Sequence, residues 1–344
     1  MTSRTAATMQ DEAHREPIIV VRDLVKHFPI NGGLFGKVVQ RVHAVDGVSF
    51  EIAKGETLAL VGESGCGKST VGRCLTRLTD ITAGEIFVNG QRIDGLGEKD
   101  MRPVRKRLSI VFQDPFSSLN PRMNVEALIS EPVRNHKIVQ GRDARRKYVG
   151  DLLERVGLRR EDMARMPHQF SGGQRQRICI ARALASNPDI IVCDEAVSAL
   201  DVSVQAQIIN LLMKLQADLG LTMLFISHDL AVIEHMSDRV AVMYLGRIVE
   251  TADRDTLFRA PKHPYTKALL SAVPLPDPTA KRERVILTGD VPSPINPPSG
   301  CCFRTRCPIA TDECAVTRPE LAPVGHGHAV ACLKVEAEVM GRKT

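Results

Sequence analysis

Short runs of consecutive apolar residues recur along the chain and predict buried β-strands. A strand that is covered on both faces reads as a continuous apolar run, as in a parallel sheet between layers of helices. Helical patterns separate the runs, so the chain predicts an α/β fold with a parallel core. The four runs are Thr57–Val61, Leu108–Phe112, Asp189–Cys193 and Thr222–Ile226.

Alternating patterns elsewhere predict an antiparallel β portion. In Gly84–Ile93 the alternation is interrupted by Asn-Gly, a dipeptide typical of two-residue hairpin turns. A second hairpin is expected within Arg239–Glu250, with its turn at Gly246. Two further strands are expected near the start of the chain, and a glycine-containing loop separates them. These strands are Ile18–Leu24 and Val42–Ile52, and the loop is Pro29–Lys37.

Between residues 114 and 170 the strand pattern stops and a helical insert is predicted. Asp143–Val156 is an amphipathic helix ended by Gly157. Prolines at 115, 121 and 132 are typical of the loops around it.

The stretch Gly62–Thr70 fits the phosphate-binding pattern G-x-x-x-x-G-K-[ST], between an expected strand and an expected helix at Thr70–Leu78. Its glycines let successive backbone N–H groups point toward one anion at a helix N-terminus. Lys68 can reach the β- and γ-phosphates, and Ser69 can ligate Mg²⁺. The alternative is a glycine-rich turn with a surface lysine. The predicted nucleotide-binding residues here are Gly62, Glu63, Ser64, Gly65, Cys66, Gly67, Lys68, Ser69 and Thr70.

Polar side chains follow the carboxyl ends of three expected strands. Gln113, the pair Asp194-Glu195 and His228 should meet at one edge of the sheet, beside the phosphate loop. There, Asp194 can hold Mg²⁺ through water and Glu195 can polarise a water aimed at the γ-phosphate. His228 can donate a hydrogen bond to that phosphate, and Asp201 closes the turn that follows Glu195.

A second helix start suited to an anion lies at Ser171, Gly172, Gly173 and Gln174. A head-to-tail dimer explains two such sites in one chain, because each turn then grips the nucleotide bound to the other chain. The alternative is a simple helix cap. Upstream, Phe28 can stack on a nucleotide base, although a core or loop aromatic is an equally good interpretation.

Composition narrows the function classes. The net charge of +6 is mild, and no basic stripe with interleaved aromatics predicts nucleic-acid binding. No apolar run is long enough to span a membrane. The first sixteen residues are polar and predict a disordered tail without a signal peptide, so a cytoplasmic location is expected.

The order of these motifs over residues 17–255 resembles the nucleotide-binding subunit of ATP-binding cassette (ABC) transporters. The resemblance implies a P-loop NTPase fold with a RecA-like core, an antiparallel β portion and the helical insert. It assigns Lys68 to the γ-phosphate, Glu195 as catalytic base and His228 as switch. It implies that Phe28 stacks on the base and that Mg²⁺ is bound by Ser69, Gln113 and Asp194. It also implies that the nucleotide of the partner chain is bound by Ser171, Gly173 and Gln174. The family usually has tyrosine in place of Phe28, leucine in place of Phe170 and Pro-Thr in place of Ala196-Val197.

Four further stretches resemble the dipeptide, oligopeptide and nickel importers within this family: Phe112–Arg122, Glu195–Gln205, Met243–Glu250 and His263–Leu270. The resemblance implies an ATPase that powers import of di- or oligopeptides from the cytoplasmic face of the membrane. Its expected partners are two membrane permeases, a second and related ATPase, and an extracytoplasmic solute-binding protein. Phe28–Ile30 and residues 33–35 favour the second ATPase of such a pair. The alternatives are import of nickel or another small solute, and a soluble cassette ATPase of translation or DNA repair.

Five of the nine cysteines lie between residues 301 and 332, after a proline-rich stretch at 291–299. This crowding in a reducing compartment indicates metal rather than disulfides. Without Cys302 the spacing is C-x5-C-x6-C-x17-C, which suits a [4Fe–4S] cluster or Zn²⁺, the latter with His326 or His328 as further ligands. The alternative is a few buried thiols. The resemblance implies the iron–sulfur cluster, held by Cys301, Cys307, Cys314 and Cys332 in a small C-terminal domain at 256–344. Cys66 and Cys193 are expected to fill space.

Overall fold

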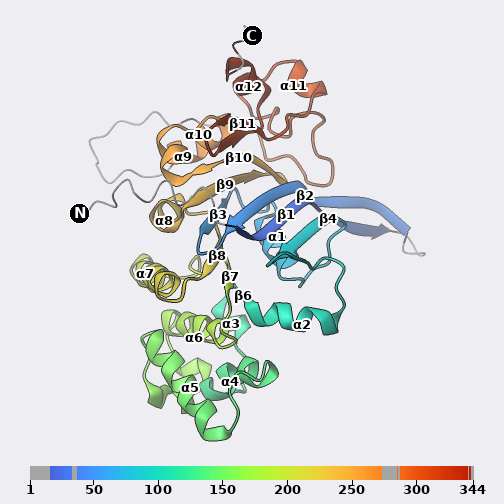
Figure 1. Ribbon diagram of the computed structural model, residues 1–344. Helices are drawn as coiled ribbons and strands as arrows, with labels where there is room; N and C mark the ends of the chain where they lie inside the picture. Colours follow the sequence, from blue (N-terminus) through green and yellow to red (C-terminus); the bar gives the residue numbers. More distant parts are fainter. Residues whose placement is uncertain (1–15, 33–36, 273–284, 286, 340, 342–344) are drawn as a thin grey trace, which may run out of the picture.

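The computed structural model describes residues 16–32, 37–272, 285, 287–339 and 341. Apart from Glu16, the predicted tail lies outside these residues, as do residues 33–35. A central sheet carries helices on its faces, with a second sheet beside it (Figure 1). Within the described residues, no helix combines the length and the apolar character needed to cross a lipid bilayer.

The parallel core of the central sheet forms from the apolar runs predicted in the sequence. Neighbouring strands run in the order β9-β3-β8-β7-β6, and all of these pairs are parallel. Every residue of β3, β7 and β8 is buried, which explains why these strands show no polar alternation. The strands are β3 (Thr57–Val61), β6 (Leu108–Val111), β7 (Ile190–Asp194), β8 (Thr222–Ser227) and β9 (Arg239–Tyr244).

The C-terminal segment extends this same sheet. The expected hairpin is present as β9 and β10 (Arg247–Asp253), which pair antiparallel. On the other side of β10 lies β12 (His328–Val330), followed by β11 (Ala322–Gly325) at the edge. Strands from both sides of the expected division at 255/256 thus share one hydrogen-bonded sheet.

The second sheet is antiparallel, with the order β2-β1-β4-β5. Its predicted hairpin at Asn89-Gly90 is confirmed by β4 (Ala83–Val88) and β5 (Gln91–Arg92), and both turn residues have positive φ.

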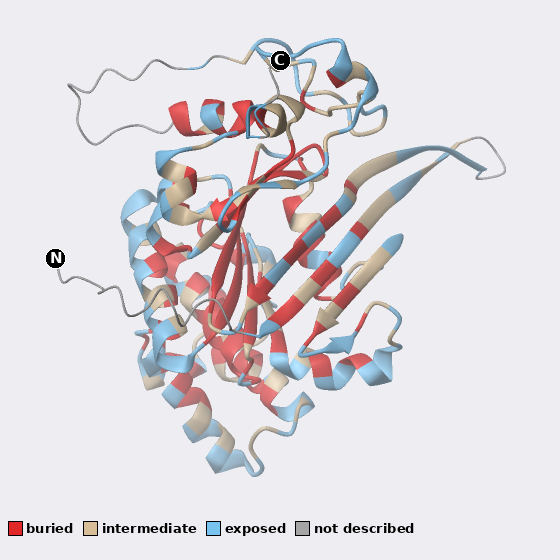
Figure 2. Cartoon of the chain, turned by 45° about the horizontal axis from the view of Figure 1, so that its top comes forward, coloured by how far each residue is buried: buried red, intermediate tan, exposed pale blue. Residues whose placement is uncertain are grey.

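The expected loop at Pro29–Lys37 is wrong in extent. β1 (Pro17–Gly32) and β2 (Lys37–Ala53) stay paired as far as Gly32 opposite Lys37, and only residues 33–36 lie between them. The outer part of this ribbon projects from the body of the molecule and is mostly exposed (Figure 2). Exposed strands need no apolar alternation, so the sequence pattern gave no signal there. Pro29 is tolerated because β4 pairs with β1 only as far as Val25.

Helices begin where the sequence offers caps. α1 (Lys68–Leu75) starts two residues earlier and ends three earlier than predicted. Aspartates at 201, 229 and 253 accept backbone N–H groups at the starts of three helices. The helices outside the insert are α2 (Glu98–Arg107), α6 (Gly172–Leu184), α7 (Val202–Leu219), α8 (Leu230–Met236), α9 (Arg254–Arg259), α10 (Pro264–Ser271), α11 (Glu313–Val316) and α12 (Leu333–Val339).

The insert is helical, as predicted, and lies at the end of the molecule opposite the C-terminal segment (Figure 1). It contains α3 (Pro115–Ser118), α4 (Val125–Asn135), α5 (Arg142–Arg155) and two 3₁₀ turns, Arg160–Ala164 and Pro167–Gln169. The prediction that Pro115 and Pro132 lie in loops is wrong, because Pro115 is the first residue of α3 and Pro132 lies inside α4. The Asn124 cap and the buried apolar face of α4 compensate for the backbone hydrogen bond that proline removes.

Candidate active site

The phosphate loop lies between β3 and α1, pressed against neighbouring backbone. Gly62 and Gly67 have φ values of 154° and 107°. A Cβ at Gly62 would lie 2.1 Å from the Met243 carbonyl oxygen, and one at Gly67 would lie 2.0 Å from that of Ala44. Both positions therefore require glycine, and the strands behind the loop fix its shape.

Lys68 lies inside the loop and is only 3% exposed. Its Nζ donates hydrogen bonds to the carbonyl oxygens of Gly62, at 2.8 Å, and Glu63, at 3.0 Å. The Lys68 ammonium group is thus held inside the loop that is predicted from the sequence to bind the phosphates.

Ser69 and Asp194 meet although 125 positions separate them. The Ser69 hydroxyl donates to Asp194 Oδ1 at 2.6 Å. Burial raises the pKa of Asp194, while the Ser69 hydrogen bond opposes that shift. Hydroxyl and carboxylate oxygens are the donor set that Mg²⁺ prefers, so this pair fits a magnesium site beside the loop.

Three of the predicted strand-end residues come together at the edge of the sheet. Gln113 Nε2 donates to Glu195 Oε2 at 2.9 Å, and His228 Nδ1 lies 3.6 Å from Glu195 Oε1. They follow β6, β7 and β8, whose parallel order brings their carboxyl ends side by side. Glu195 has a φ of 48°, an uncommon conformation for a residue with a side chain.

Ser171 caps α6 and forms a reciprocal capping box with Gln174. The Gln174 N–H donates to Ser171 Oγ at 3.3 Å, and the Ser171 N–H donates to Gln174 Oε1 at 3.0 Å. Both residues are exposed. A Cβ at Gly173 would lie 2.4 Å from Val204, so the helix start packs closely on α7. Asp201 caps α7, and its hydrogen bonds from Val204 and Ser203 lower its pKa.

Phe28 is 38% exposed on β1, so it is neither a core nor a loop aromatic. The Lys26 ammonium lies 4.8 Å from the centre of its ring. An exposed aromatic face is available for stacking.

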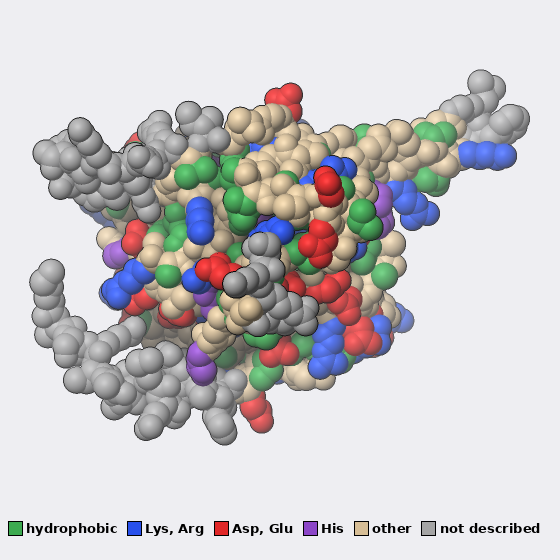
Figure 3. Space-filling view, turned by 90° about the horizontal axis from the view of Figure 1, so that it is seen from above, with side chains coloured by type: hydrophobic (Ala, Val, Ile, Leu, Met, Phe, Trp, Pro, Cys, Tyr) green, Lys and Arg blue, Asp and Glu red, His purple; other side chains and the backbone are tan. Residues whose placement is uncertain are grey.

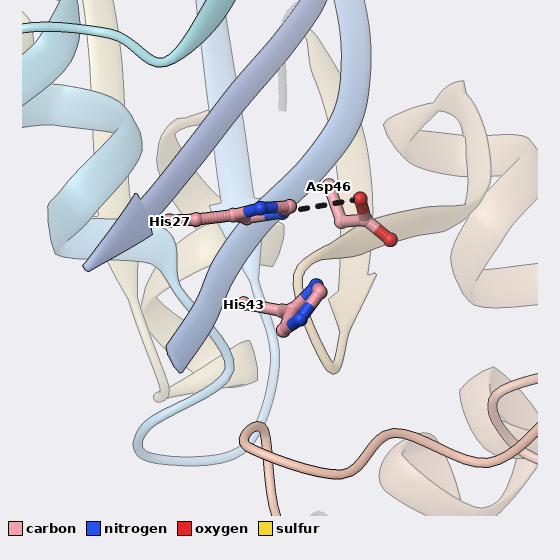
Figure 4. A group of neighbouring side chains, drawn as sticks. All are labelled: His27, His43 and Asp46. Carbon is pink, nitrogen blue, oxygen red and sulfur yellow. Dashed lines mark hydrogen bonds and ion pairs between the residues drawn. The ribbon is translucent and has the colours of Figure 1, made fainter. Parts of the chain in front are cut away.

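Next to Phe28, His27 and His43 belong to a separate cluster around Asp46 (Figure 4). His27 Nε2 lies 3.3 Å from Asp46 Oδ1, and the two imidazole rings are 4.0 Å apart. Asp46 also pairs with Arg247 and, more distantly, with Arg318. Two arginines neutralise the charge of the Asp46 carboxylate, so we interpret the cluster as a set of ion pairs that connects β2 to the C-terminal segment.

Four cysteines line one small pocket in the C-terminal segment: Cys301, Cys307, Cys314 and Cys332. Cys302 lines a different cavity instead. Among the described residues, the group whose ligand atoms lie close enough together to hold a metal ion is His27, His43 and Asp46, and it does not include these cysteines. Burial raises the pKa of Cys307 to about 11. His328 Nε2 lies 2.8 Å from Oε1 of the buried Glu250, and His328 does not line the pocket.

Cys66 and Cys193, which the sequence predicts to fill space, are both buried. Cys193 is fully buried, and burial raises its pKa to about 12. Cys66 is also buried, with its sulfur 3.8 Å from Lys68 Nζ, and burial raises its pKa. Thiols with raised pKa values are poor nucleophiles, which agrees with a space-filling role.

Two residues that touch the phosphate loop were missed in the sequence. Tyr265 Oη accepts the Glu63 N–H at 2.9 Å, and Arg306 donates two hydrogen bonds to the Glu63 carboxylate. Tyr265 lies in the His263–Leu270 stretch, which served only as a family marker. Arg306 precedes Cys307 and carried no signal of its own, because no pattern connects it with residue 63.

Comparison with known proteins agrees with this geometry. A family model described as ABC transporter matches residues 45–198, and one described as oligopeptide/dipeptide transporter, C-terminal region, matches residues 249–314. The probable peptide ABC transporter ATP-binding protein y4tS of Sinorhizobium fredii is 55% identical over 317 residues, which cover 92% of this chain and 90% of that protein. The oligopeptide transport ATP-binding protein AppF of Bacillus subtilis is 54% identical over 93% of this chain and 98% of its own length.

Solved structures show the same cassette. The dimeric ATP-binding cassette MJ0796 bound to ADP and Pi matches with a TM-score of 0.61 and 26% identity, over 69% of this chain and 98% of that chain. CbiO1 of Clostridium perfringens matches with the same TM-score and 28% identity, over 71% of this chain and 92% of that one. The P-loop fold expected from the sequence is therefore confirmed. The chain belongs to the ATP-binding proteins of the ABC transporter family, in the group with the oligopeptide/dipeptide transporter C-terminal region.

Proposed function

We propose that this chain binds and hydrolyses ATP to power the import of di- or oligopeptides through a membrane ABC transporter. The observation that carries the proposal is the meeting of Gln113, Glu195 and His228 beside the Ser69–Asp194 pair. Relatives with more than half of their residues identical carry names of peptide transport proteins, which favours peptides over nickel and over a soluble, non-transport role.

Each side chain has a role that follows from its position. Lys68 binds the γ-phosphate, and the loop N–H groups from Gly62 to Thr70 surround the remaining phosphate oxygens. Ser69, Asp194 and Gln113 hold Mg²⁺, which neutralises charge on the β- and γ-phosphates when bound. Glu195 accepts a proton from the attacking water, and His228 orients the γ-phosphate. Phe28 stacks on the base.

Hydrolysis requires two cassettes. In the capped turn at residues 171–174, Ser171 and Gln174 are exposed and bond to each other, so a second molecule can approach them. We propose that it grips the nucleotide held by the loop of a partner ATPase, which is a related chain or a second copy. The similar cassette MJ0796 has been described as a dimer with ADP and Pi, which supports this arrangement.

For the C-terminal segment, treated as a domain at 256–344, we propose a [4Fe–4S] cluster on Cys301, Cys307, Cys314 and Cys332. Four cysteines that line one pocket, with Cys314 buried and the other three partly buried, fit such a group. The cysteine spacing lacks the C-x2-C pairs that are common in structural zinc sites, which favours the cluster over Zn²⁺. Within a short, loop-rich segment, the cysteine ligands would act as a staple.

The proposed partners are two permeases, the second ATPase and an extracytoplasmic solute-binding protein. The chain would work at the cytoplasmic face of the membrane, where Gln113 and the insert transmit closure of the ATPase dimer to the permeases. No nucleic-acid partner is proposed. On the face seen in Figure 3, acidic and basic side chains lie intermixed, in keeping with the mild net charge.

The test is to capture the tagged chain from native membranes in mild detergent and identify what accompanies it by mass spectrometry. We expect two permeases, a second ATPase and a solute-binding protein, whose bound solutes are peptides. A chain that arrives alone or with ribosomes would contradict transport. A binding protein loaded with nickel would contradict the peptide assignment and leave the ATPase chemistry standing.

A further inference from the structure

Two side chains of the C-terminal segment, Arg306 and Tyr265, bind the same residue of the phosphate loop, Glu63. Arg306 Nη1 and Nη2 donate to the two carboxylate oxygens of Glu63 at 2.8 and 3.2 Å. Tyr265 Oη accepts the backbone N–H of the same residue at 2.9 Å. Both partners lie beyond residue 198, outside the part of the chain that matches the ABC transporter model.

Glu63 is in turn connected to Lys68. Its carbonyl oxygen accepts from Lys68 Nζ at 3.0 Å, and its N–H donates to Tyr265 Oη. The carboxylate, the N–H and the carbonyl of Glu63 are thus all engaged. A displacement of residue 63 would therefore change the position of the lysine that is to meet the phosphates.

The two anchoring side chains are themselves fixed. Tyr265 is fully buried, and its ring packs edge-on against Tyr244 at 4.7 Å and near Phe303 at 5.5 Å. The Arg306 side chain is only 9% exposed, and its guanidinium lies 6.0 Å from the Tyr244 ring. Partly buried, two-point contacts of this kind hold a group in place better than fully exposed ion pairs do.

Charge gives the Arg306 contact a second consequence. A carboxylate in a loop that must receive a polyphosphate repels the incoming ligand over a few ångströms. The bidentate contact with the Arg306 guanidinium neutralises the charge of the Glu63 carboxylate. It also fixes the orientation of that carboxylate, because two hydrogen bonds prevent its rotation.

We propose that Arg306 and Tyr265 are positioning residues that keep the phosphate loop ready for ATP, so that the cysteine segment controls nucleotide affinity. This inference rests on the proposed ATP-binding function. Arg306 directly precedes Cys307, and its N–H donates to the Phe303 carbonyl at 3.0 Å within the turn that Cys301 begins. A change in the cysteine pocket therefore reaches Glu63 through the backbone of this one turn.

The experiment measures binding of MgATP to the purified full-length chain by isothermal titration calorimetry, at a temperature where hydrolysis is negligible. The variants are Arg306→Ala, Arg306→Lys and Tyr265→Phe. Arg304→Ala is the matched control, because Arg304 lies in the same turn and its side chain donates to Ser299 rather than to Glu63. Arg306→Ala is expected to weaken binding about tenfold and Tyr265→Phe about threefold, with Arg306→Lys between wild type and Arg306→Ala. Arg304→Ala should bind as wild type does.

A double-mutant cycle separates positioning from general stability. In a Glu63→Gln background, Arg306→Ala should weaken MgATP binding less than twofold further, since the charge that Arg306 balances is absent. Thermal unfolding of each variant checks that it is folded. The inference would be overturned if the losses of MgATP affinity from Glu63→Gln and Arg306→Ala were additive. It would also be overturned if Arg304→Ala lost as much affinity as Arg306→Ala, or if Arg306→Ala bound MgATP as wild type does. Failure of the wild-type chain to bind MgATP would instead refute the proposed function.

Discussion

The amide of Gln113 donates a 2.9 Å hydrogen bond to the carboxylate of Glu195, across 82 positions of sequence. Gln113 follows β6 and leads into the helical insert, whereas Glu195 follows β7 and is the proposed catalytic base. The contact joins the proposed site of hydrolysis to the part of the chain expected to face the permeases. We therefore expect motion of the insert to change the position of the Glu195 carboxylate through this hydrogen bond.

Gly67→Ala tests whether the shape of the phosphate loop is fixed by its surroundings. The added Cβ would lie 2.0 Å from the Ala44 carbonyl oxygen, at a φ of 107°. We expect loss of measurable ATP binding and a decrease of about 2–4 kcal/mol in the free energy of unfolding. Gly95→Ala is the control, because its Cβ would meet nothing within 4 Å, and it should change stability by less than about 0.5 kcal/mol. Retained ATP binding in Gly67→Ala would contradict the account of the loop.

Ser171→Arg tests the proposed role of the exposed capped turn at a partner's nucleotide. The variant should bind ATP within about twofold of wild type, because the turn bonds only within itself in one chain. Its hydrolysis rate should fall by at least about a hundredfold, since a bulky cation at the dimer interface prevents closure. Gln140→Arg adds the same charge at an exposed position of the insert and should hydrolyse ATP normally. Equal rates for the two variants would show that this turn does not contribute to hydrolysis.

The cysteine assignment predicts a difference between two adjacent residues. Cys301→Ser should remove most iron and sulfide from anaerobically purified protein, because it deletes one of four ligands in the pocket. Cys302→Ser should keep both, since Cys302 lines another cavity. Iron, sulfide and zinc analyses with the visible absorption spectrum measure this. Colourless wild-type protein with one zinc per chain would contradict the cluster.

His263 predicts a pH dependence of stability. Its burial lowers its pKa to about 3, well below the ordinary value of 6.5. The unfolded chain thus takes up a proton below pH 6.5 that the folded chain refuses, so stability falls as the pH drops from 6.5 toward 3. Between pH 6.5 and 5.0, we expect protonation of this group in the unfolded chain to lower the free energy of unfolding by roughly 1.5–2 kcal/mol.

Chemical denaturation across this pH range, in wild type and in His263→Asn, measures the effect. Asparagine can replace His263 Nδ1 as acceptor for the Tyr265 N–H at the start of α10. The variant should lose this part of the pH dependence. Identical pH profiles would show that His263 does not limit stability in acid.

The sequence was most informative where local chemistry and topology coincide. Buried parallel strands have a continuous apolar pattern, and their carboxyl ends share an edge, so the meeting of Gln113, Glu195 and His228 could be predicted. The Ser69–Asp194 contact follows from the same reasoning, because the phosphate loop begins at the end of β3 in the same sheet. Motif order then made the family recognisable.

The rest depends on contacts that no local pattern encodes. The outer parts of β1 and β2 are exposed and satisfy each other's backbone, so they lack an apolar signal. Pro132 lies in a helix because tertiary burial outweighs its intrinsic preference. Arg306 meets Glu63 from 243 positions away, through a segment whose packing on the cassette is visible only in the fold.

The most direct test of the central claim compares Glu195→Gln with wild type in the transporter captured from membranes and reconstituted in vesicles. Glu234→Gln, an exposed glutamate of α8, is the matched control. We predict that Glu195→Gln binds MgATP with wild-type affinity but loses at least about a hundredfold in ATP hydrolysis, and that peptide uptake stops with it. Glu234→Gln should retain both activities. Hydrolysis and uptake at wild-type rates in Glu195→Gln would contradict the claim that this carboxylate drives peptide import.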